Sequence, residues 1–239
     1  MNNWMDPDTL AMRSESRAVS VNRIFNFVYG WMAVGLAVSG VVAWFVAQAV
    51  RSGQVVLSSG LLMGCCVVEV VMVLGISAAI MKLSPAAAAG LFVGFSAVNG
   101  VSLSFIFFAY GQGTIQTAFF ISAGMFAGMA LIGTVTTKAL DGIGRLCIMG
   151  LWGLILASVV NIFMGSSALD YGLSLLGVGV FMGLTAWDAQ KVRRLADLQH
   201  TMDGVTIRRL GILAALELYL DFINLFIYVL RVFFADRRN

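Results

Sequence analysis

Four carboxylates of this sequence fall within or at the end of long apolar stretches, where a charge needs a reason. Glu217 and Asp221 interrupt the apolar run AALELYLDFINLFIYVLR, residues 214–231, while Glu69 and Asp188 fall in two other runs. If these runs cross a bilayer, an ionised carboxylate near its centre costs about 2.5–3.5 kcal/mol on insertion scales. Such side chains must therefore pair with a cation, face water or hold a proton, and each is a candidate functional residue.

The spacing of the polar residues in the last apolar run places them on one face of a helix. Glu217, Asp221, Asn224, Tyr228 and Arg231 are separated by four, three, four and three residues, and the five share a sector about 80° wide at 100° per residue. Asn224 and Tyr228 alone are typical of the hydrogen bonds that join helices in membranes. Together with the carboxylates, they favour an ion pathway that includes Glu217, Asn224 and, in a deeper cavity, Glu69.

Asp188 and Asp221 are the candidates for a proton-sensing pair. Counted from Arg209 at 1.5 Å per residue, Glu217 lies about 12 Å and Asp221 about 18 Å into the membrane. Asp188 ends its run three residues before Lys191, in the same half of the membrane. If the two aspartates meet, charges about 4 Å apart repel by roughly 4 kcal/mol at an effective dielectric of 20, so the pair would share one proton near neutral pH. Because loss of that proton would part the helices or admit a cation, the pair predicts a pH-gated cation leak.

The same oxygen atoms predict the permeating ion. Calcium takes six to eight oxygen ligands, which Asp188, Glu217, Asp221 and Asn224 can supply together with water and backbone carbonyls. The sequence contains no EF-hand pattern, so we expect a weak calcium site at Asp188, Glu217 and Asp221, as permeation requires. No cofactor is expected.

The elements that position these residues are long apolar helices. The 239 residues are 60% hydrophobic and 11% charged, against roughly 25% charged in soluble domains. The apolar runs are long enough to cross a bilayer as helices, and they do not alternate as barrel strands do. The sequence therefore predicts an all-α integral membrane protein with seven spans: Ile24–Val50, Val55–Met81, Ala86–Tyr110, Thr114–Thr137, Leu146–Met164, Leu169–Ala189 and Leu210–Phe234. Small residues four apart, Ala86/Gly90/Gly94, Gly60/Gly64, Gly124/Gly128 and Gly179/Gly183, predict close helix packing.

One membrane domain accounts for the chain after its first residues. We expect residues 1–23 to form a mobile polar head, residues 24–239 a single membrane domain, and residues 190–209 a polar cytoplasmic loop. With a cytoplasmic N-terminus, eleven of the fifteen Lys and Arg residues fall on the inner side, as the positive-inside rule favours. The arginines at the C-terminus do not fit this count, and they would be cytoplasmic if the last run re-entered the membrane.

Several classes of function lack their residues. The three cysteines lie in or beside the spans and the single histidine, His200, lies in a polar segment, so neither a disulfide framework nor a Cys/His metal site is available. The scattered basic residues give no support to nucleic-acid binding. An enzyme is not expected, because the motifs of intramembrane aspartyl proteases and of serine hydrolases are missing. A proton-coupled transporter is also disfavoured, since no matched pair of broken hydrophobic runs occurs.

Three segments resemble the Bax inhibitor (transmembrane Bax-inhibitor-motif) family in its bacterial branch. They are TAWDAQKV at 185–192, LELYLDFINLF at 216–226 and VVEVVMV at 67–73. The resemblance implies a seven-helix bundle with the last helix central, ringed by the other six, and a pH-sensing aspartyl pair that controls a calcium leak. The pair maps onto Asp188 and Asp221, and the acidic position of the second helix maps onto Glu69.

The resemblance also implies a latch and an alternative function. In the family, a basic residue at the inner end of the second helix can pair with the aspartate of the sixth helix and close the pore. Here that position holds Lys82, a point charge that cannot form the bidentate pair of an arginine. Some bacterial members bind and restrain a membrane-bound ATP-dependent protease, so a regulatory membrane protein is the alternative. The expected location is the bacterial inner membrane, with membrane lipid, calcium and protons as partners.

Overall fold

The described chain is built from helices. A computed structural model describes the backbone of residues 7–236 and the side chains of residues 22–233, and no strand occurs in this part of the chain. Seven helices are long and apolar enough to cross a membrane within the described residues, so the prediction of an all-α, seven-span membrane protein is confirmed. The helices are α1 (Pro7–Arg51), α2 (Ser59–Ala79), α3 (Pro85–Leu103), the short α4 (Ile106–Ala109), α5 (Gln112–Val135), α6 (Asp141–Met164), α7 (Ser167–Leu198) and α8 (Gly204–Asp236).

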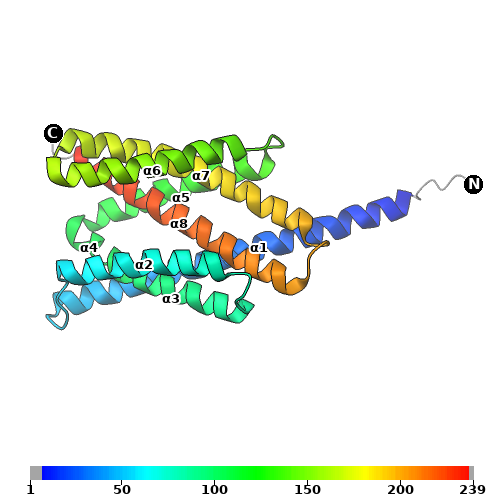
Figure 1. The fold of residues 1–239 in the computed structure, drawn as a ribbon, viewed down its shortest axis with the longest axis horizontal. Helices are drawn as coiled ribbons and strands as arrows, with labels where there is room; N and C mark the ends of the chain where they lie inside the picture. The colour runs from blue at the N-terminus through cyan, green and yellow to red at the C-terminus, as the bar shows by residue number, and fades with distance from the viewer. Residues whose placement is uncertain (1–6, 237–239) are drawn as a thin grey trace, which may run out of the picture.

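The last helix, α8, is the central one. It packs against α1, α3, α5 and α7, and 67% of its most apolar stretch is buried (Figure 1). The corresponding buried share is only 6% in α2 and in α6. α2 packs mainly on α3, and α6 packs mainly on α7. The predicted central position of the last helix is thus confirmed, but the helices that surround it directly are four rather than six. Because most residues of α2 and α6 are apolar and few are buried, these helices are suited to the lipid-facing side of the bundle.

The described part of the expected polar head is a helix. α1 begins at Pro7 and continues without a break to Arg51, and its first turns extend past the ends of the other helices (Figure 1). The expected polar head is therefore helical over residues 7–23, its mobility stays a prediction, and residues 1–6 lie outside the described residues. The physical reason for the helix is that no proline or glycine follows Pro7 until Gly30, and Pro is favoured in the first turn of a helix.

The expected loop at 190–209 is also mostly helical. α7 continues to Leu198 and α8 begins at Gly204, so only residues 199–203 lie between them. Val192 and Ala196 are buried one helical turn apart, which holds the end of α7 against the bundle. Asp203 caps α8, because its Oδ2 accepts hydrogen bonds from the backbone N–H groups of the second and third residues that follow, each at 3.0 Å.

α8 crosses the bundle instead of turning back. It is continuous from Gly204 to Asp236, and the first turn of α1 and the last turn of α8 lie at opposite ends of the bundle (Figure 1). A re-entrant last segment, the alternative that would return the C-terminus to the starting face, does not fit this continuous helix.

Among the predicted glycines, Gly183 allows close packing, because it lies against Sγ of Cys147 in α6, but most of the others do not. A side chain at Gly64, Gly90, Gly124, Gly128 or Gly179 would meet nothing within 4 Å, so these positions of the predicted pairs do not mediate close contact. Close contact occurs also at Gly133, which lies against the backbone of Ala186, and at Gly144, which lies against the ring of Trp187. α5 and α6 thereby clamp the two residues of α7 that precede Asp188.

Candidate functional site

Three acidic residues of α7 and α8, Asp188, Glu217 and Asp221, line one cavity. This cavity has a volume of about 420 Å³ and lies between α6, α7 and α8. Its polar lining is made by side chains of α7 and α8, whereas α6 contributes apolar residues such as Leu151. The polar lining residues are Trp187, Asp188, Lys191, Glu217, Asp221, Asn224 and Tyr228. We call this space the acid cavity; it brings together every predicted site residue except Glu69 and Lys82.

Asp188 and Asp221 form the buried part of the acid cavity. They are 7% and 4% exposed, and both line the same cavity, where their charges are close enough to influence each other. Oδ2 of Asp221 is buried without a hydrogen-bond partner in the described part of the chain. Two carboxyl groups close together away from water do not both ionise freely, and a proton shared between them relieves their repulsion. The structure thus brings the two aspartates of the sequence hypothesis to one cavity, while a proton shared between them stays a prediction.

The ammonium group of Lys191 sits between two of the carboxylates. Its Nζ lies 2.8 Å from Oδ1 of Asp188 and donates a hydrogen bond of 2.7 Å to Oε2 of Glu217. The same Nζ lies 4.3 Å from the ring centroid of Trp187, within the range of a cation–π contact. Lys191 thus holds the position that a bound cation would take, at the mouth of the acid cavity.

The expected latch residue lies elsewhere. Lys82 is exposed in the turn that follows α2, and α2 packs on α3 rather than on α7. Lys191, one turn after Asp188 on the same helix, is the cation that pairs with this aspartate. The sequence interpretation used Lys191 only to mark the membrane surface, although its i, i+3 spacing from Asp188 was a readable signal for an ion pair.

The carboxylates do not form a ready-made metal site in this arrangement. Among the described residues, no three His, Cys, Asp or Glu side chains are grouped closely enough to hold a metal ion. The expected calcium site at Asp188, Glu217 and Asp221 would therefore require rearrangement, because the ammonium of Lys191 now binds two of these three side chains.

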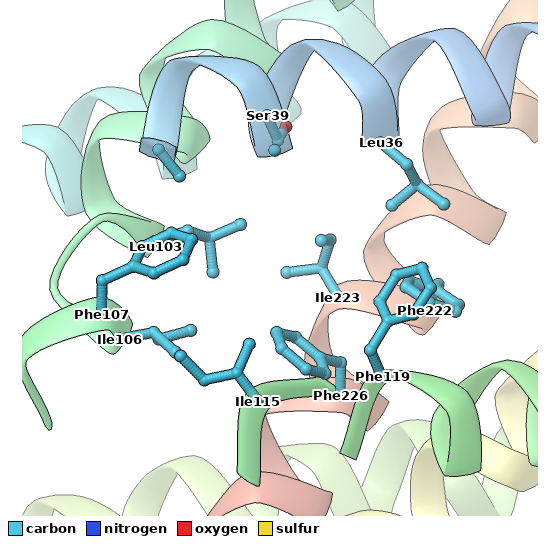
Figure 2. A pocket seen from close by; sticks show the side chains of 12 residues that line it. Leu36, Ser39, Leu103, Ile106, Phe107, Ile115, Phe119, Phe222, Ile223 and Phe226 are labelled. Carbon is cyan, nitrogen blue, oxygen red and sulfur yellow. The ribbon is translucent and has the colours of Figure 1, made fainter. Parts of the chain in front are cut away.

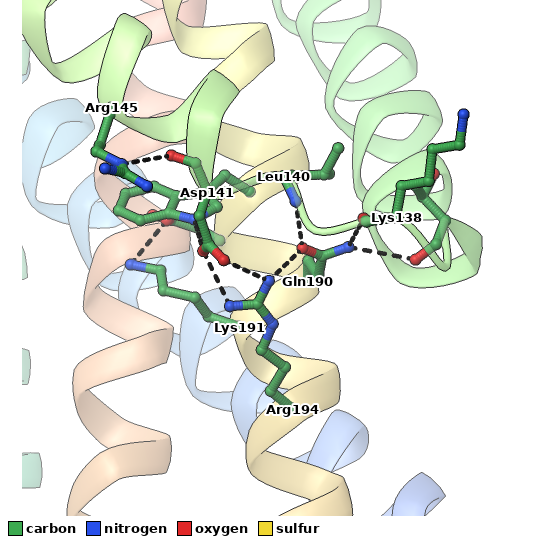
Figure 3. Close-up of polar contacts among 10 residues, drawn as sticks. Lys138, Leu140, Asp141, Arg145, Gln190, Lys191 and Arg194 are labelled. Atoms are coloured by element: carbon green, nitrogen blue, oxygen red, sulfur yellow. Dashed lines mark hydrogen bonds and ion pairs between the residues drawn. The ribbon is translucent and has the colours of Figure 1, made fainter.

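A second polar cluster holds the wall of the acid cavity in place. Asp141, the first residue of α6, accepts two hydrogen bonds from Arg194, at 2.9 and 3.0 Å, and one of 2.9 Å from Nε1 of Trp187 (Figure 3). Gln190 accepts from Arg194 at 2.7 Å and binds the backbone of the 136–140 connection through both its oxygen and its nitrogen. This cluster ties the start of α6 to α7 and fixes the indole on which Lys191 rests.

The sequence interpretation missed this cluster. Its charged members were assigned to connections between spans, and nothing in their spacing along the chain links position 141 to positions 187 and 194. Only the packing of α6 on α7 brings them together.

Glu69 belongs to a different polar network, on the other side of α8. It accepts hydrogen bonds from Ser102 at 2.6 Å and from Asn99 at 3.3 Å. Asn99 in turn accepts from the hydroxyl of Tyr219 at 2.7 Å, and this hydroxyl shares a hydrogen bond of 2.6 Å with Ser39. Tyr219 is two residues from Glu217 and two from Asp221, which corresponds to a rotation of about 200° around the axis of α8. Its side chain therefore points away from both carboxylates. Glu69 therefore joins α2, α3, α8 and α1, and it does not line the acid cavity.

The end of the acid cavity near Tyr228 is less acidic. The amide nitrogen of Asn224 donates a hydrogen bond of 2.8 Å to the carbonyl of Leu220 in its own helix. Tyr228 stacks on Phe181 with ring centroids 5.7 Å apart, and the guanidinium of Arg231 lies 5.5 Å from the Tyr228 ring. The polar face predicted for the last helix thus runs from Glu217 toward Arg231, with the carboxylates at one end.

Comparison with known proteins places the chain among bacterial membrane proteins. The family model described as inhibitor of apoptosis-promoting Bax1 matches residues 21–239. The inner membrane protein YbhL of Escherichia coli K12 is 41% identical over 212 residues, which cover 88% of this chain and 90% of that protein. A protein of Borreliella burgdorferi is 42% identical over 219 residues, 91% of this chain and 94% of the relative. A protein of Deinococcus radiodurans is 38% identical over 223 residues, 93% of this chain and 95% of the relative.

Proposed function

This chain belongs to the Bax inhibitor family, as its sequence motifs predicted, and we propose that it forms a pH-sensitive cation leak in the membrane. The observation that carries the proposal is the acid cavity, in which Asp188 and Asp221 are both buried and Asp188 is paired with the ammonium group of Lys191. It is a multi-pass membrane protein, and an intramembrane cluster of ionisable residues is characteristic of ion or proton pathways.

The charge balance of the acid cavity supports a dependence on pH. With both aspartates and Glu217 ionised, three negative charges face the one positive charge of Lys191. When the aspartates share a proton, only two negative charges remain. Loss of that proton adds another negative charge without a counter-ion in a medium of low dielectric, and a cation entering the cavity would compensate for it. The leak should therefore grow as the pH is raised through the titration of the pair.

Lys191 is the closing element of the proposed leak. Its ammonium occupies the place between Asp188 and Glu217 that a permeating cation would need. An entering ion has to compete for these carboxylates, and Lys191 can swing away because its side chain is 32% exposed. Calcium is the proposed ion, since a divalent cation that prefers carboxylate oxygen can displace a monovalent ammonium. The leak requires no catalytic residue and no cofactor.

The proposed orientation has the N-terminus in the cytoplasm of a bacterial cell. The excess of Lys and Arg on that side supports it, and the Escherichia coli relative is an inner membrane protein. Asp188 and Glu217 then lie toward the cytoplasmic end of the bundle. A fall in cytoplasmic pH would protonate the pair and close the path, with lipid, protons and calcium as the partners of the protein.

Calcium flux into liposomes tests the proposal. The purified protein should carry a calcium flux that increases with pH, and the Asp221→Asn variant should lose the pH dependence. Glu69→Gln is a matched control, because it removes a carboxylate that the acid cavity does not contain. A protein that folds but carries no flux at any pH would overturn the leak. That result, together with copurification of a membrane-bound ATP-dependent protease, would favour the alternative of a regulatory membrane protein.

A further inference from the structure

A second cavity lies on the other side of the central helix. It has a volume of about 180 Å³ and is lined by α1, α5 and α8, by the last residue of α3 and by α4. Figure 2 shows Leu36, Ile115, Phe119 and Ile223 around the empty space, and all the lining residues except Ser39 are apolar. We call this space the apolar cavity. None of its lining residues belongs to the acid cavity.

Water is a poor occupant of the apolar cavity. Ser39 offers the only polar side chain, and its hydroxyl is already bonded to the hydroxyl of Tyr219 at 2.6 Å and to the carbonyl of Ser96 at 2.7 Å. A buried water needs two to four polar partners, and cavities with apolar walls stay dry. An empty space of this size would leave the side chains around it without contacts on one side. The apolar lining therefore favours an apolar molecule as the occupant of this cavity.

The apolar cavity opens toward the lipid. Its floor is made by buried side chains of α8, whereas its rim includes Gly40 of α1 and Phe119 of α5, which are both exposed. α1 and α5 are not among the helix pairs that pack closely together. Because both helices are membrane spans, the gap between them faces the hydrocarbon of the bilayer, where the available apolar molecules are lipid chains.

A cation lies where the head of such a lipid would be. Arg51 ends α1 eight residues after Ala43 of the cavity wall, about 12 Å along the helix axis. Its guanidinium donates a hydrogen bond of 3.5 Å to the carbonyl of Phe107, another residue of the wall, and lies 5.7 Å from the ring centroid of Phe108. Arg51 is exposed at the membrane boundary, and a guanidinium binds phosphate through two parallel hydrogen bonds.

We propose that the apolar cavity and Arg51 form a phospholipid-binding site, in which one acyl chain fills the cavity and the guanidinium binds the phosphate. The chain contacts Phe222, Ile223 and Phe226 of α8 on the side opposite the acid cavity. The bound lipid thus completes the packing of the central helix. This site does not depend on the cation leak.

The test uses a phospholipid with a photoreactive diazirine in its acyl chain and the full-length protein in membranes. Gly40→Leu fills the mouth of the apolar cavity, since a side chain at Gly40 meets nothing within 4 Å. Gly30→Leu is its matched control: Gly30 lies on the same helix, is equally exposed and unobstructed, and is remote from the cavity. Neither substitution strains the helix, because leucine has a higher helix propensity than glycine.

We expect cross-links to concentrate on residues such as Leu36, Ile115 and Ile223, to disappear in Gly40→Leu, and to remain in Gly30→Leu. Labelling spread evenly over the outer faces of α2 and α6, or equal labelling in the two variants, would overturn the site. Arg51→Gln should lower labelling by the phospholipid while leaving labelling by a diazirine fatty acid unchanged. If Arg51→Gln affects neither probe, phosphate binding is refuted.

Discussion

Replacement of Lys191 by methionine removes the one ammonium group of the acid cavity while keeping a side chain of similar length. Asp188 and Glu217 then lose the cation that lies 2.8 and 2.7 Å from their oxygen atoms. We expect a larger cation leak at every pH in this variant, because an entering ion no longer has to displace the ammonium group of Lys191. The rise of the leak with pH should persist, since the aspartyl pair is intact.

The expected size of the effect follows from the burial of the two ion pairs. The pair with Glu217 is between side chains that are 32% and 36% exposed, and such pairs contribute about 0–1 kcal/mol. The pair with Asp188 has a partner that is only 9% exposed, so about 1.5–3 kcal/mol is appropriate for a hydrogen bond to a charged group. If this pair is broken on entry of an ion, its removal should accelerate the leak by roughly tenfold to a hundredfold, at 1.4 kcal/mol for each factor of ten.

The assay is calcium entry into liposomes that contain a calcium-sensitive dye, with equal amounts of folded protein. Lys82→Met is the matched control, because it removes an exposed lysine that does not lie at the acid cavity, and it should leave the flux unchanged. Lys191→Arg should stay closer to the original protein than Lys191→Met, since the charge is kept. An unchanged flux in Lys191→Met would refute the closing role of this lysine, and an increase in Lys82→Met would restore the latch that the family resemblance implied.

Three further predictions concern the scaffold. Hydrogen bonds from the side chain and backbone of Thr206 hold the pKa of Asp203 below its ordinary value of 3.8. The ionised carboxylate therefore stabilises α8 above pH 3.8, and this stabilisation is lost as the pH falls through the lowered pKa. Asp203→Asn should abolish the corresponding drop in melting temperature at acid pH. Gly133→Ala places a methyl group against the backbone of α7 and should lower the unfolding free energy by about 1–3 kcal/mol, seen as a lower melting temperature in detergent. Gly128→Ala is the control: its methyl group would face open space, so the melting temperature should not fall. Tyr219→Phe removes the hydroxyl that links α8 to α1 and α3, and it should lower the unfolding free energy by about 0.6–1.7 kcal/mol. The cation flux should not change, because this hydroxyl points away from the acid cavity.

Hydropathy and spacing were enough to predict the spans and the polar face of the last helix. The length of each apolar run is set by the thickness of the bilayer, so seven helices could be counted from the chain alone. The shared face of Glu217, Asp221 and Asn224 follows from the geometry of a single helix, and the structure finds all three at one cavity. Helix ends were less predictable, because burial of Val192 and Ala196 extends α7 through a segment whose charges indicated a loop.

Contacts between helices could not be predicted in the same way. The rotation of each helix decides which of its faces meets a neighbour, so Glu69 was assigned to the ion pathway although it faces Asn99 and Ser102. The same uncertainty made Gly128 a candidate for close packing when Gly133 is the residue in contact. That Lys82 does not pair with Asp188 likewise depends on which helices are neighbours, whereas the pairing of Lys191 with Asp188 agrees with their i, i+3 spacing on one helix.

The pH profile of calcium flux in the Asp188→Asn, Asp221→Asn and double variants tests the central claim most directly. If the two aspartates titrate as one unit, each single substitution removes the shared proton, and the double variant should lose no more pH dependence than either single one. All three profiles should then be flat where the original protein shows a rising flux. A pH dependence that survives in either single variant, or that is lost in two independent steps, would contradict a shared proton between Asp188 and Asp221.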